Sequence, residues 1–476
     1  MHKLFGAALP MVVMGCMVGE SVTIDDPGIA MLERHIATPL PSNSPLPDPT
    51  GTFATATTNG PIDLGNPFFQ DLGTNGRRCV SCHVPAAAWT ITPSQVRAVF
   101  DATNGGTRAD TLGLGAIFRT NDGANAPTAD VSTLDKRRAA YSMLINRGLI
   151  RVGLPIPATA EFVLVAVDDP YGYASAAELS LFRRPLPSTN LKFLSTVMWD
   201  GRETQPSQSI HFDLSQQSSD ATQGHAQGNP LSDAQRESIV GFETALFTAQ
   251  VYDNDAAELN AVGVDGGPDA LVDQPFYIGI NDNFGDSQTH APFTPVVFDL
   301  YDAWTNTNDA AAGAVAQRRA VARGQALFNT RTINISGVSG INDEPAFGSP
   351  ASVAGSCTTC HDTPNSGNHS VVAPLDIGLT DAVRRTPDMP LYTLRNKTTG
   401  EIRQTTDPGR ALISGKWKHI GRFKGPILRA LAARAPYFHN GLAADLAAVI
   451  DFYDGRFAIG LTAQDKSDLV AFLRTL

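Results

Sequence analysis

Two copies of one pentapeptide pattern, CVSCH and CTTCH, supply the residues best suited to do chemistry in this chain. Two thiols three positions apart can both form thioethers to the vinyl groups of one haem, and the next histidine then lies beneath the iron as its proximal ligand. The chain has only 5 cysteines and 10 histidines in 476 residues, too few for two such matches to arise by chance. The residues concerned are Cys79, Cys82 and His83 in the first copy and Cys357, Cys360 and His361 in the second.

Other uses of a CxxC motif explain less of this pattern. A disulfide within each CxxC would suit an exported chain, but it gives the two histidines no role. A zinc site would gather all four thiolates and again leave the histidines idle. A thioredoxin-like redox motif is normally single and lies in a βαβ context. The pattern therefore predicts two covalently bound haem c groups in an oxidising compartment.

Composition limits the fold and the partners. A chain of 476 residues is long enough for two or three domains. Charged residues make up only 17%, while Gly (42) and Pro (32) are plentiful, which indicates many turns. The formal charge of −11 argues against nucleic acid as a partner, because a phosphate backbone binds clustered Lys and Arg. Because the surroundings of the two motifs also repeat, we expect a mainly α fold of two tandem c-type cytochrome domains with long irregular loop insertions.

The N-terminal residues have the pattern of a secretory signal, since Lys3 precedes an apolar stretch that ends in Gly15 and Cys16. Cys16 is either the site of a lipid anchor or part of a plainly secreted chain. A Pro-rich stretch follows and predicts an extended tether. We therefore expect a periplasmic protein, anchored to the membrane if Cys16 is lipidated. The predicted segments are a signal peptide at 1–15, the tether at 16–60, an N-terminal haem c domain with insertions at 61–310 and a C-terminal haem c domain at 311–476.

Capping residues and hydrophobic periodicity predict the elements that position these motifs. Helices are expected to begin after Thr92, Ser232 and Thr462. Another helix leads into the second CxxCH motif, and a short amphipathic helix carries Tyr453 near its end. Strands are expected to be scarce, and the best candidate runs over residues 160–167.

Several longer stretches resemble one known family. They are NPFFQDLGTNGRRCVSCH, STVMWDGRE, GQALF followed by CTTCH, and FKGPILRALAARAPYFHNG continuing through FYDG to the terminal LVAFLRTL. From Pro61 onward, most of the chain resembles the bacterial di-haem cytochrome c peroxidase family, including its MauG branch. In that family the N-terminal haem reacts with hydrogen peroxide and the C-terminal haem relays electrons to it. The resemblance implies that His83 and His361 are the two proximal ligands and that Trp199 bridges the haems.

The resemblance also directs attention to the distal side of the first haem. No histidine lies between His83 and His211, so the histidine that blocks this iron in typical members is missing from that loop. Family members use a glutamine and a glutamate after WDGR, and ungapped comparison places Gln217 and Gln227 near these positions. Gln227 cannot exchange protons, whereas the neighbouring His225 can. We predict that His225 is the distal acid–base group or a ligand, with Gln217 beside it and His211 as the alternative.

The sixth ligand of the second haem separates the two branches of the family. A methionine ligates this haem in the peroxidase branch, and a tyrosine occupies the position in the MauG branch. Here the position is Tyr453, whose phenolate would lower the haem potential, although a core-filling role competes with ligation. Met389 is the alternative ligand. His439 is expected to orient the haem pocket or its propionates.

The family also holds a calcium ion between its domains. Arg184 and Arg434 stand at two of the ligand positions in this sequence, which puts that calcium site in doubt.

The resemblance implies an exported di-haem c-type oxidoreductase that reduces hydrogen peroxide at the N-terminal haem. Electrons would come through the C-terminal haem from a small soluble donor, a cytochrome c or a cupredoxin. Two alternatives stay open. One is a MauG-like oxidation of a partner protein or other substrate through high-valent haem. The other is a non-catalytic di-haem electron-transfer cytochrome.

Overall fold

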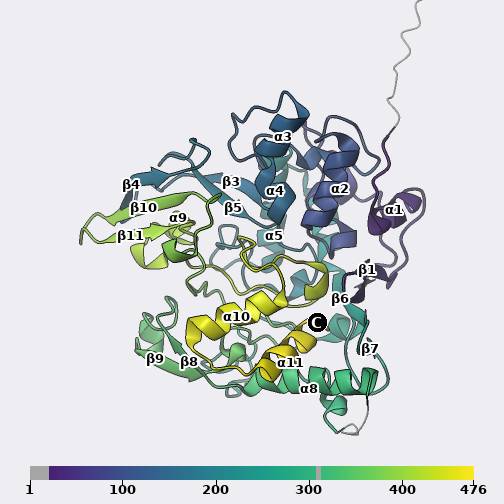
Figure 1. Ribbon diagram of the computed structural model, residues 1–476, viewed down its shortest axis with the longest axis vertical. Coiled ribbons are helices and arrows are strands. Elements are labelled where there is room, and N and C mark those ends of the chain that lie inside the picture. Colours follow the sequence, from purple (N-terminus) through teal and green to yellow (C-terminus); the bar gives the residue numbers. More distant parts are fainter. Residues whose placement is uncertain (1–20, 307–311) are drawn as a thin grey trace, which may run out of the picture.

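The computed structural model describes residues 21–306 and 312–476 (Figure 1). The predicted signal peptide at 1–15 and the proposed lipid site Cys16 lie outside the described residues. The helices are α1 (Pro27–Arg34), α2 (Pro93–Thr103), α3 (Leu134–Ala140), α4 (Ser142–Arg147), α5 (Ile210–His225), α6 (Asp233–Thr244), α7 (Asp269–Asp273), α8 (Ala314–Thr330), α9 (Ala411–Ser414), α10 (Leu446–Phe457) and α11 (Ala463–Leu473). The strands are β1 (Leu46–Asp48), β2 (Gly51–Thr57), β3 (Ile150–Leu154), β4 (Phe162–Asp168), β5 (Leu179–Arg183), β6 (Leu246–Asp253), β7 (Ala257–Glu258), β8 (Ile333–Ser336), β9 (Ser352–Gly355), β10 (Leu391–Asn396) and β11 (Ile402–Thr405).

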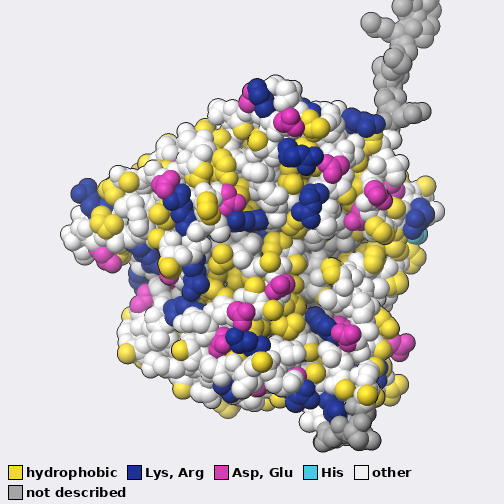
Figure 2. All heavy atoms as spheres, viewed as in Figure 1, with side chains coloured by type: hydrophobic (Ala, Val, Ile, Leu, Met, Phe, Trp, Pro, Cys, Tyr) yellow, Lys and Arg dark blue, Asp and Glu magenta, His cyan; other side chains and the backbone are white. Residues whose placement is uncertain are grey.

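The elements form an upper and a lower layer in the view of Figure 1. Helices α1 to α4 lie in the upper part, and α8, α10 and α11 lie in the lower part with strands β8 and β9. Figure 2 shows hydrophobic side chains gathered across the middle of this face, between the two parts. None of the helices in the described part of the chain is long and apolar enough to cross a membrane.

The predicted helix starts are confirmed at their capping residues. The Thr92 side chain accepts a hydrogen bond from the backbone N–H of Gln95 at the start of α2. Ser232 begins α6 and Thr462 begins α11, each through a reciprocal capping box. The predicted strand at 160–167 is also confirmed, as β4.

Strands are more numerous than the sequence predicted, and two of their pairings join segments far apart along the chain. The order β1-β2-β6-β7 makes a four-stranded sheet, and β2 pairs with β6 across about 200 residues. A second sheet has the order β11-β10-β4 and joins the two halves of the chain. Two further pairs, β3-β5 and β8-β9, complete the strands. Whether the whole is the mainly α, two-cytochrome fold stays a prediction.

The N-terminal segment differs from the extended tether predicted for residues 16–60. From residue 21 onward it folds as α1, β1 and β2, and its side chains Ile29, Leu32 and Phe53 are buried. The Asp26 side chain caps α1, and Pro27 occupies the first helical turn. The tether prediction is therefore corrected for this part, because buried apolar side chains hold it against the rest of the molecule.

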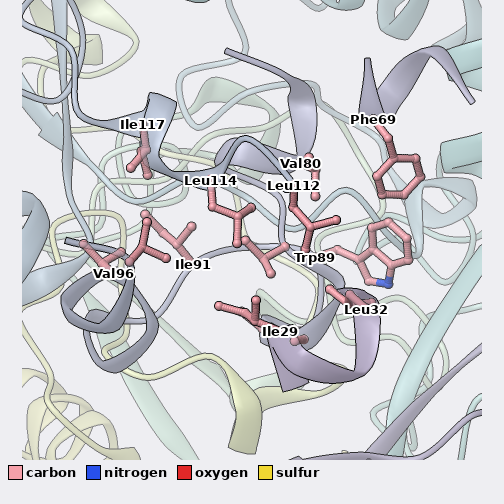
Figure 3. Close-up of a cluster of buried hydrophobic side chains, with 14 of the residues drawn as sticks. Ile29, Leu32, Phe69, Val80, Trp89, Ile91, Val96, Leu112, Leu114 and Ile117 are labelled. Carbon is pink, nitrogen blue, oxygen red and sulfur yellow. The ribbon is translucent and has the colours of Figure 1, made fainter. Parts of the chain in front are cut away.

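A hydrophobic cluster surrounds the first CxxCH motif. Figure 3 shows Leu32 of α1 beside Trp89, in a cluster that also contains Ile29 and Val80, which lies inside the motif. Trp89 is fully buried and donates a hydrogen bond from its indole N–H to the hydroxyl of Thr55 at 3.0 Å. The N-terminal segment thus completes the packing behind the first motif.

Packing also crosses the predicted domain boundary at residue 310. Side chains from residues 256–304 share one hydrophobic cluster with α8 and α11. Conversely, Tyr392 and Leu394 of β10 pack with residues from the first half of the chain. The division into 61–310 and 311–476 stays a prediction. Segments on each side of residue 310 pack in hydrophobic clusters with residues from the other side.

A buried ion cluster joins the halves directly. The Arg183 guanidinium donates two hydrogen bonds to Asp407, at 2.7 and 2.9 Å, and one to Asp200 at 2.6 Å. All three side chains are buried. Burial alone would raise the pKa of Asp200, but the charges of Arg183 and Arg202 outweigh it and lower this pKa to about 2.

Replacing Arg183 by methionine is expected to lower the free energy of unfolding by about 3–5 kcal/mol at pH 7, because two carboxylates remain buried without their cation. The lowered pKa of Asp200 means that its stabilisation is complete above about pH 4 and is lost as the pH falls towards 2. The deficit of the variant should therefore shrink on acidification. Urea denaturation followed by circular dichroism measures it, with the exposed Lys192→Met as control. A deficit below about 1 kcal/mol at pH 7 would contradict this role.

Candidate functional site

One large cavity gathers the residues predicted for the first haem. It encloses about 1660 Å³ of space not filled by atoms, part of it open to solvent. The structure brings together at its walls all six residues that the sequence assigned to this haem, namely Cys79, Cys82, His83, Trp199, Gln217 and His225.

His83 is held in the form that a metal ligand requires. Its Nδ1 lies 3.3 Å from the backbone carbonyl oxygen of Trp89, a contact that fixes the ring and leaves Nε2 available. Burial lowers the pKa of His83 to about 4, so the imidazole is neutral at pH 7. Trp89 reaches this position through a left-handed backbone, with φ of +63°. A neutral, oriented imidazole beside two thiols fits haem c.

His225 lies at the end of α5 and forms a pair with Asp122. The Nδ1 atom of His225 hydrogen-bonds to the Asp122 carboxylate, and Arg77 lies 3.6 Å from the same carboxylate. Burial would raise the pKa of Asp122, but the hydrogen bond and charge of His225, together with Arg77, lower it. The charge of His225 adds to burial in lowering the pKa of His83, which lines the same cavity.

Gln217 is a second predicted distal side chain in the cavity wall, on the same helix as His225. Gln217 lies eight residues earlier in α5, two turns along the same face, and both residues line the cavity and its smaller neighbour. The alternative candidate, His211, does not line it. His211 is exposed and pairs with Glu237 at 3.0 Å, so this alternative is corrected.

Three titratable side chains in the cavity, the half-buried Asp122 and the buried Glu243 and Lys424, were missed by sequence reasoning. Asp122 falls in an irregular insertion about 100 residues before its partner. Burial raises the pKa of Glu243 to about 7, and burial lowers the pKa of Lys424 to about 7. The Lys424 ammonium donates to the carbonyl oxygen of Thr196 at 2.8 Å. In the sequence, Lys424 belongs to the FKGP stretch, which contributes to the family resemblance but gives no sign that this lysine lines the cavity.

Trp199 borders this cavity and contacts a row of rings on its other side. Its indole N–H donates to the carbonyl oxygen of Arg184 at 2.8 Å, and its ring meets the His439 ring edge-on at 6.1 Å. His439 stacks on Phe423 with ring centroids 3.9 Å apart. Phe423 pairs through its backbone with Leu375, which packs in a cluster bordered by Cys357 and Cys360. The rings therefore extend from the first cavity towards the second CxxCH motif.

Two residues with an unfavourable backbone conformation set the directions of the Trp199 and His439 rings. Met198 and Phe438 directly precede Trp199 and His439, and both have φ of +66°, in the left-handed region that non-glycine residues rarely adopt. Such strain persists only where the surroundings enforce it. Neither ring nitrogen of His439 has a hydrogen-bond partner, although the residue is buried. Burial lowers the pKa of His439 to about 4, so the ring is neutral at pH 7.

The second CxxCH motif has a similar histidine and a tyrosine beside it. The Nδ1 atom of His361 lies 2.5 Å from the carbonyl oxygen of Gly367, and burial lowers the pKa of His361. Burial and the neighbouring Cys360 and Cys357 together raise the pKa of Tyr453 on α10. Phe457, one turn later, stacks on Tyr453 and borders the same cluster as both cysteines. The predicted second-site residues are thus close together and fit a second haem c.

Met389, the alternative ligand, lies elsewhere. It is buried against Met143, Leu149 and Phe182, in a cluster without either cysteine of the second motif. Of the two candidates, Tyr453 is the one beside this motif.

The residues at the expected calcium positions do not fit a cation. Arg184 and Arg434 are buried side by side, and the Arg184 guanidinium donates to the carbonyl oxygen of Arg434 at 3.1 Å. Its other acceptors are the carbonyl oxygens of Ile91 and Arg147. Arg434 likewise donates to backbone carbonyls, and within the described chain no group of three or more acidic, histidine or cysteine side chains could hold a metal ion.

Excess EGTA is therefore expected to leave the thermal midpoint of the protein unchanged to within about 1 °C, because an ion that does not bind contributes no stabilisation. Differential scanning calorimetry with EGTA and with added Ca²⁺ measures this, and Mg²⁺ serves as the matched control. A rise in the midpoint that depends on Ca²⁺ alone would show that a calcium site exists.

Comparisons with known proteins agree with the motifs. No family model matches the chain. It is 30% identical over 140 residues to the cytochrome-c peroxidase IdrP1 of Pseudomonas sp. (strain SCT), and 32% identical over 133 residues to the cytochrome-c peroxidase IdrP2 of Denitromonas iodatirespirans. These matches cover 25% and 26% of this chain and 36% of each relative, so the chain spans about a third of their length.

A solved structure of a MauG-like protein associated with microbial copper homeostasis aligns over 92% of this chain and 93% of its own, with 17% identity and a TM-score of 0.36. That score is too low to carry an argument about this chain. The sequence relatives are both named cytochrome-c peroxidases. The two CxxCH motifs and these relatives support a likeness to the di-haem cytochrome c peroxidase family.

Proposed function

We propose that this chain is an exported, periplasmic di-haem c-type peroxidase that reduces hydrogen peroxide at the haem attached to Cys79 and Cys82. Cys357, Cys360 and His361 would hold a second haem, which would supply the electrons. The observation that carries the proposal is the His225–Asp122 pair in the cavity that also holds His83. The relatives named cytochrome-c peroxidases support the same reaction class.

Bound haem c would supply the redox chemistry that converts hydrogen peroxide, two electrons and two protons into two molecules of water. The residues of the chain handle the protons. Asp122 accepts a hydrogen bond from Nδ1–H of His225, which leaves Nε2 free to take a proton from one peroxide oxygen and give it to the other. Gln217 offers an amide on the same helix face to orient the peroxide.

A second candidate is supported by Tyr453. A tyrosine ligand to the second haem would lower its potential and favour the oxidation of a partner protein or other substrate over rapid turnover with a small electron donor. The neighbourhood of Tyr453, Cys357 and Cys360 supports this version. A non-catalytic electron carrier, the third class, would need a protein group to fill the space beside His83, and His225 as an iron ligand would do so.

Replacing His225 by alanine is expected to lower kcat/KM for hydrogen peroxide by about 10²- to 10⁴-fold, because the proton relay is lost. Asp122→Asn should lower it less and change its pH profile, since the ring would lose its anionic partner. Stopped-flow mixing with peroxide measures both. His211→Ala is the matched control, because His211 is an exposed histidine on the same helix. If His225→Ala reacted like the control, the proposed acid–base role would be wrong.

Replacing Tyr453 by methionine is expected to change the optical spectrum of the second haem and to raise its reduction potential, because a neutral thioether would replace an anionic ligand. Spectroelectrochemical titration measures both quantities. Met389→Leu is the control and should alter neither, since Met389 packs in a separate cluster. An unchanged potential in Tyr453→Met, together with a changed one in Met389→Leu, would reverse the assignment.

A further inference from the structure

The proposed reaction has a requirement that His225 alone does not meet. Reduction of hydrogen peroxide to two molecules of water consumes two protons, and these must come from solvent. His225 takes a proton from one peroxide oxygen and gives it to the other, so it moves a proton within the site but supplies none on balance. Because His225 and its partner Asp122 are only partly exposed, protons need a route from solvent to this pair.

A second, smaller cavity adjoins the haem cavity at this pair. It encloses about 580 Å³ of space not filled by atoms, part of it open to solvent. Asp122, Gln217 and His225 line both cavities, so the distal side of the first site faces both. Two further carboxylic residues, Glu203 and Asp220, line the smaller cavity alone. We call the smaller cavity the vestibule.

Helix α5 forms one wall of the vestibule. Gln217, Asp220, Gly224 and His225 line it from this helix, and spacings of three and four residues place side chains on one helix face. A Cβ atom added at Gly224 would have no neighbour within 4 Å, so this part of the wall is open. Asp220 is exposed and His225 is half-buried. The wall therefore leads from solvent at Asp220 inwards to His225.

Glu203 reaches the vestibule from the turn that follows Trp199. Its carboxyl group is hydrogen-bonded to that of Asp220, which requires that one of the two carries a proton, because an ionised carboxylate can only accept. The Glu203 side chain is only 18% exposed, whereas Asp220 is exposed. The pair therefore joins solvent to the inside of the vestibule.

The charges around Glu203 help it to keep a proton. Burial and the neighbouring carboxylate of Asp220 raise the pKa of Glu203, and Asp200 adds to this rise. The Arg202 guanidinium, 3.9 Å from the Glu203 carboxyl group, offsets part of it. The other charged or titratable groups of the vestibule are Asp122 and His225. A carboxyl group with a raised pKa is a proton donor that operates closer to neutral pH than an ordinary one.

We propose that the Glu203–Asp220 pair delivers the protons of peroxide reduction from solvent to the distal side of the first haem. This inference rests on the proposed function and adds two residues to its proton path. The pair gives its shared proton to water in the vestibule, which passes a proton on towards His225, and Asp220 then takes a new proton from solvent. Two such transfers for each peroxide supply the two protons that end in water.

Replacing Glu203 by glutamine tests the inference, because it removes the ionisable group at nearly the same size. The first step with peroxide should keep its rate to within about twofold, since His225 returns there the proton that it takes. By contrast, kcat at pH 6 with a small dye as electron donor should fall about tenfold, because every turnover takes up two protons. Wild-type kcat should decline with rising pH as the pair loses its proton, and Glu203→Gln should lack this decline. Stopped-flow mixing and steady-state assays of the holoprotein measure these rates.

Two further variants separate proton delivery from a structural role. Glu203→Asp keeps a carboxyl group and should recover most of the wild-type kcat, and the exposed Asp220→Asn should lower kcat as Glu203→Gln does, with less effect on folding. Glu237→Gln is the matched control, because Glu237 is an exposed glutamate on α6 that lines neither cavity.

The outcomes also distinguish this inference from the proposed function. If Glu203→Gln and Asp220→Asn had the kcat and pH profile of the control, the proton-delivery role would be wrong while the peroxidase function stood. An equal loss in kcat and in the first step with peroxide would overturn the role too, because it would indicate a distorted site. A wild-type holoprotein that reduces no peroxide would contradict the proposed function, and this inference with it.

Discussion

The bonds of Arg183 set the geometry on which both sites depend. This buried guanidinium neutralises two buried carboxylates, Asp200 beside Trp199 and Asp407 in the second half of the chain. The position of Trp199 between the first cavity and the row of rings is thus tied to an ion cluster that spans the two halves. Burying three charges is costly unless each is fully paired, so the cluster permits little variation in how the halves meet.

Around this fixed contact the two sites differ in their chemistry. The first has a large cavity with titratable side chains in its wall, including the His225–Asp122 pair. The second is closed in by aromatic and aliphatic side chains, with Tyr453 near its cysteines. Titratable side chains in the wall of the first site suit proton-coupled chemistry on a small molecule, whereas the apolar surroundings of the second site suit electron transfer. The asymmetry is what the proposed division of labour requires.

The sequence predicted best those features whose chemistry is local. The CxxCH spacing predicts haem attachment by itself, and the caps at Thr92 and Ser232 determine where helices begin. The sequence could not predict Asp122 as the partner of His225, because about 100 residues separate them and Asp122 lies in an irregular loop. The N-terminal segment was predicted to be an extended tether because it is rich in proline. The few apolar residues among these prolines pack against the first motif. Several strands were missed because they are short, and the pairings of β2 with β6 and of β4 with β10 also depend on distant segments.

The central claim is that the first haem stands open to peroxide while the second has a protein ligand on both sides. Low-temperature electron paramagnetic resonance of the purified ferric protein, with spins counted against haem content, tests it most directly. One high-spin and one low-spin iron in equal amounts is the predicted result. Two low-spin irons would contradict the account, because a protein group, with His225 the nearest candidate, would then occupy the position where peroxide must bind.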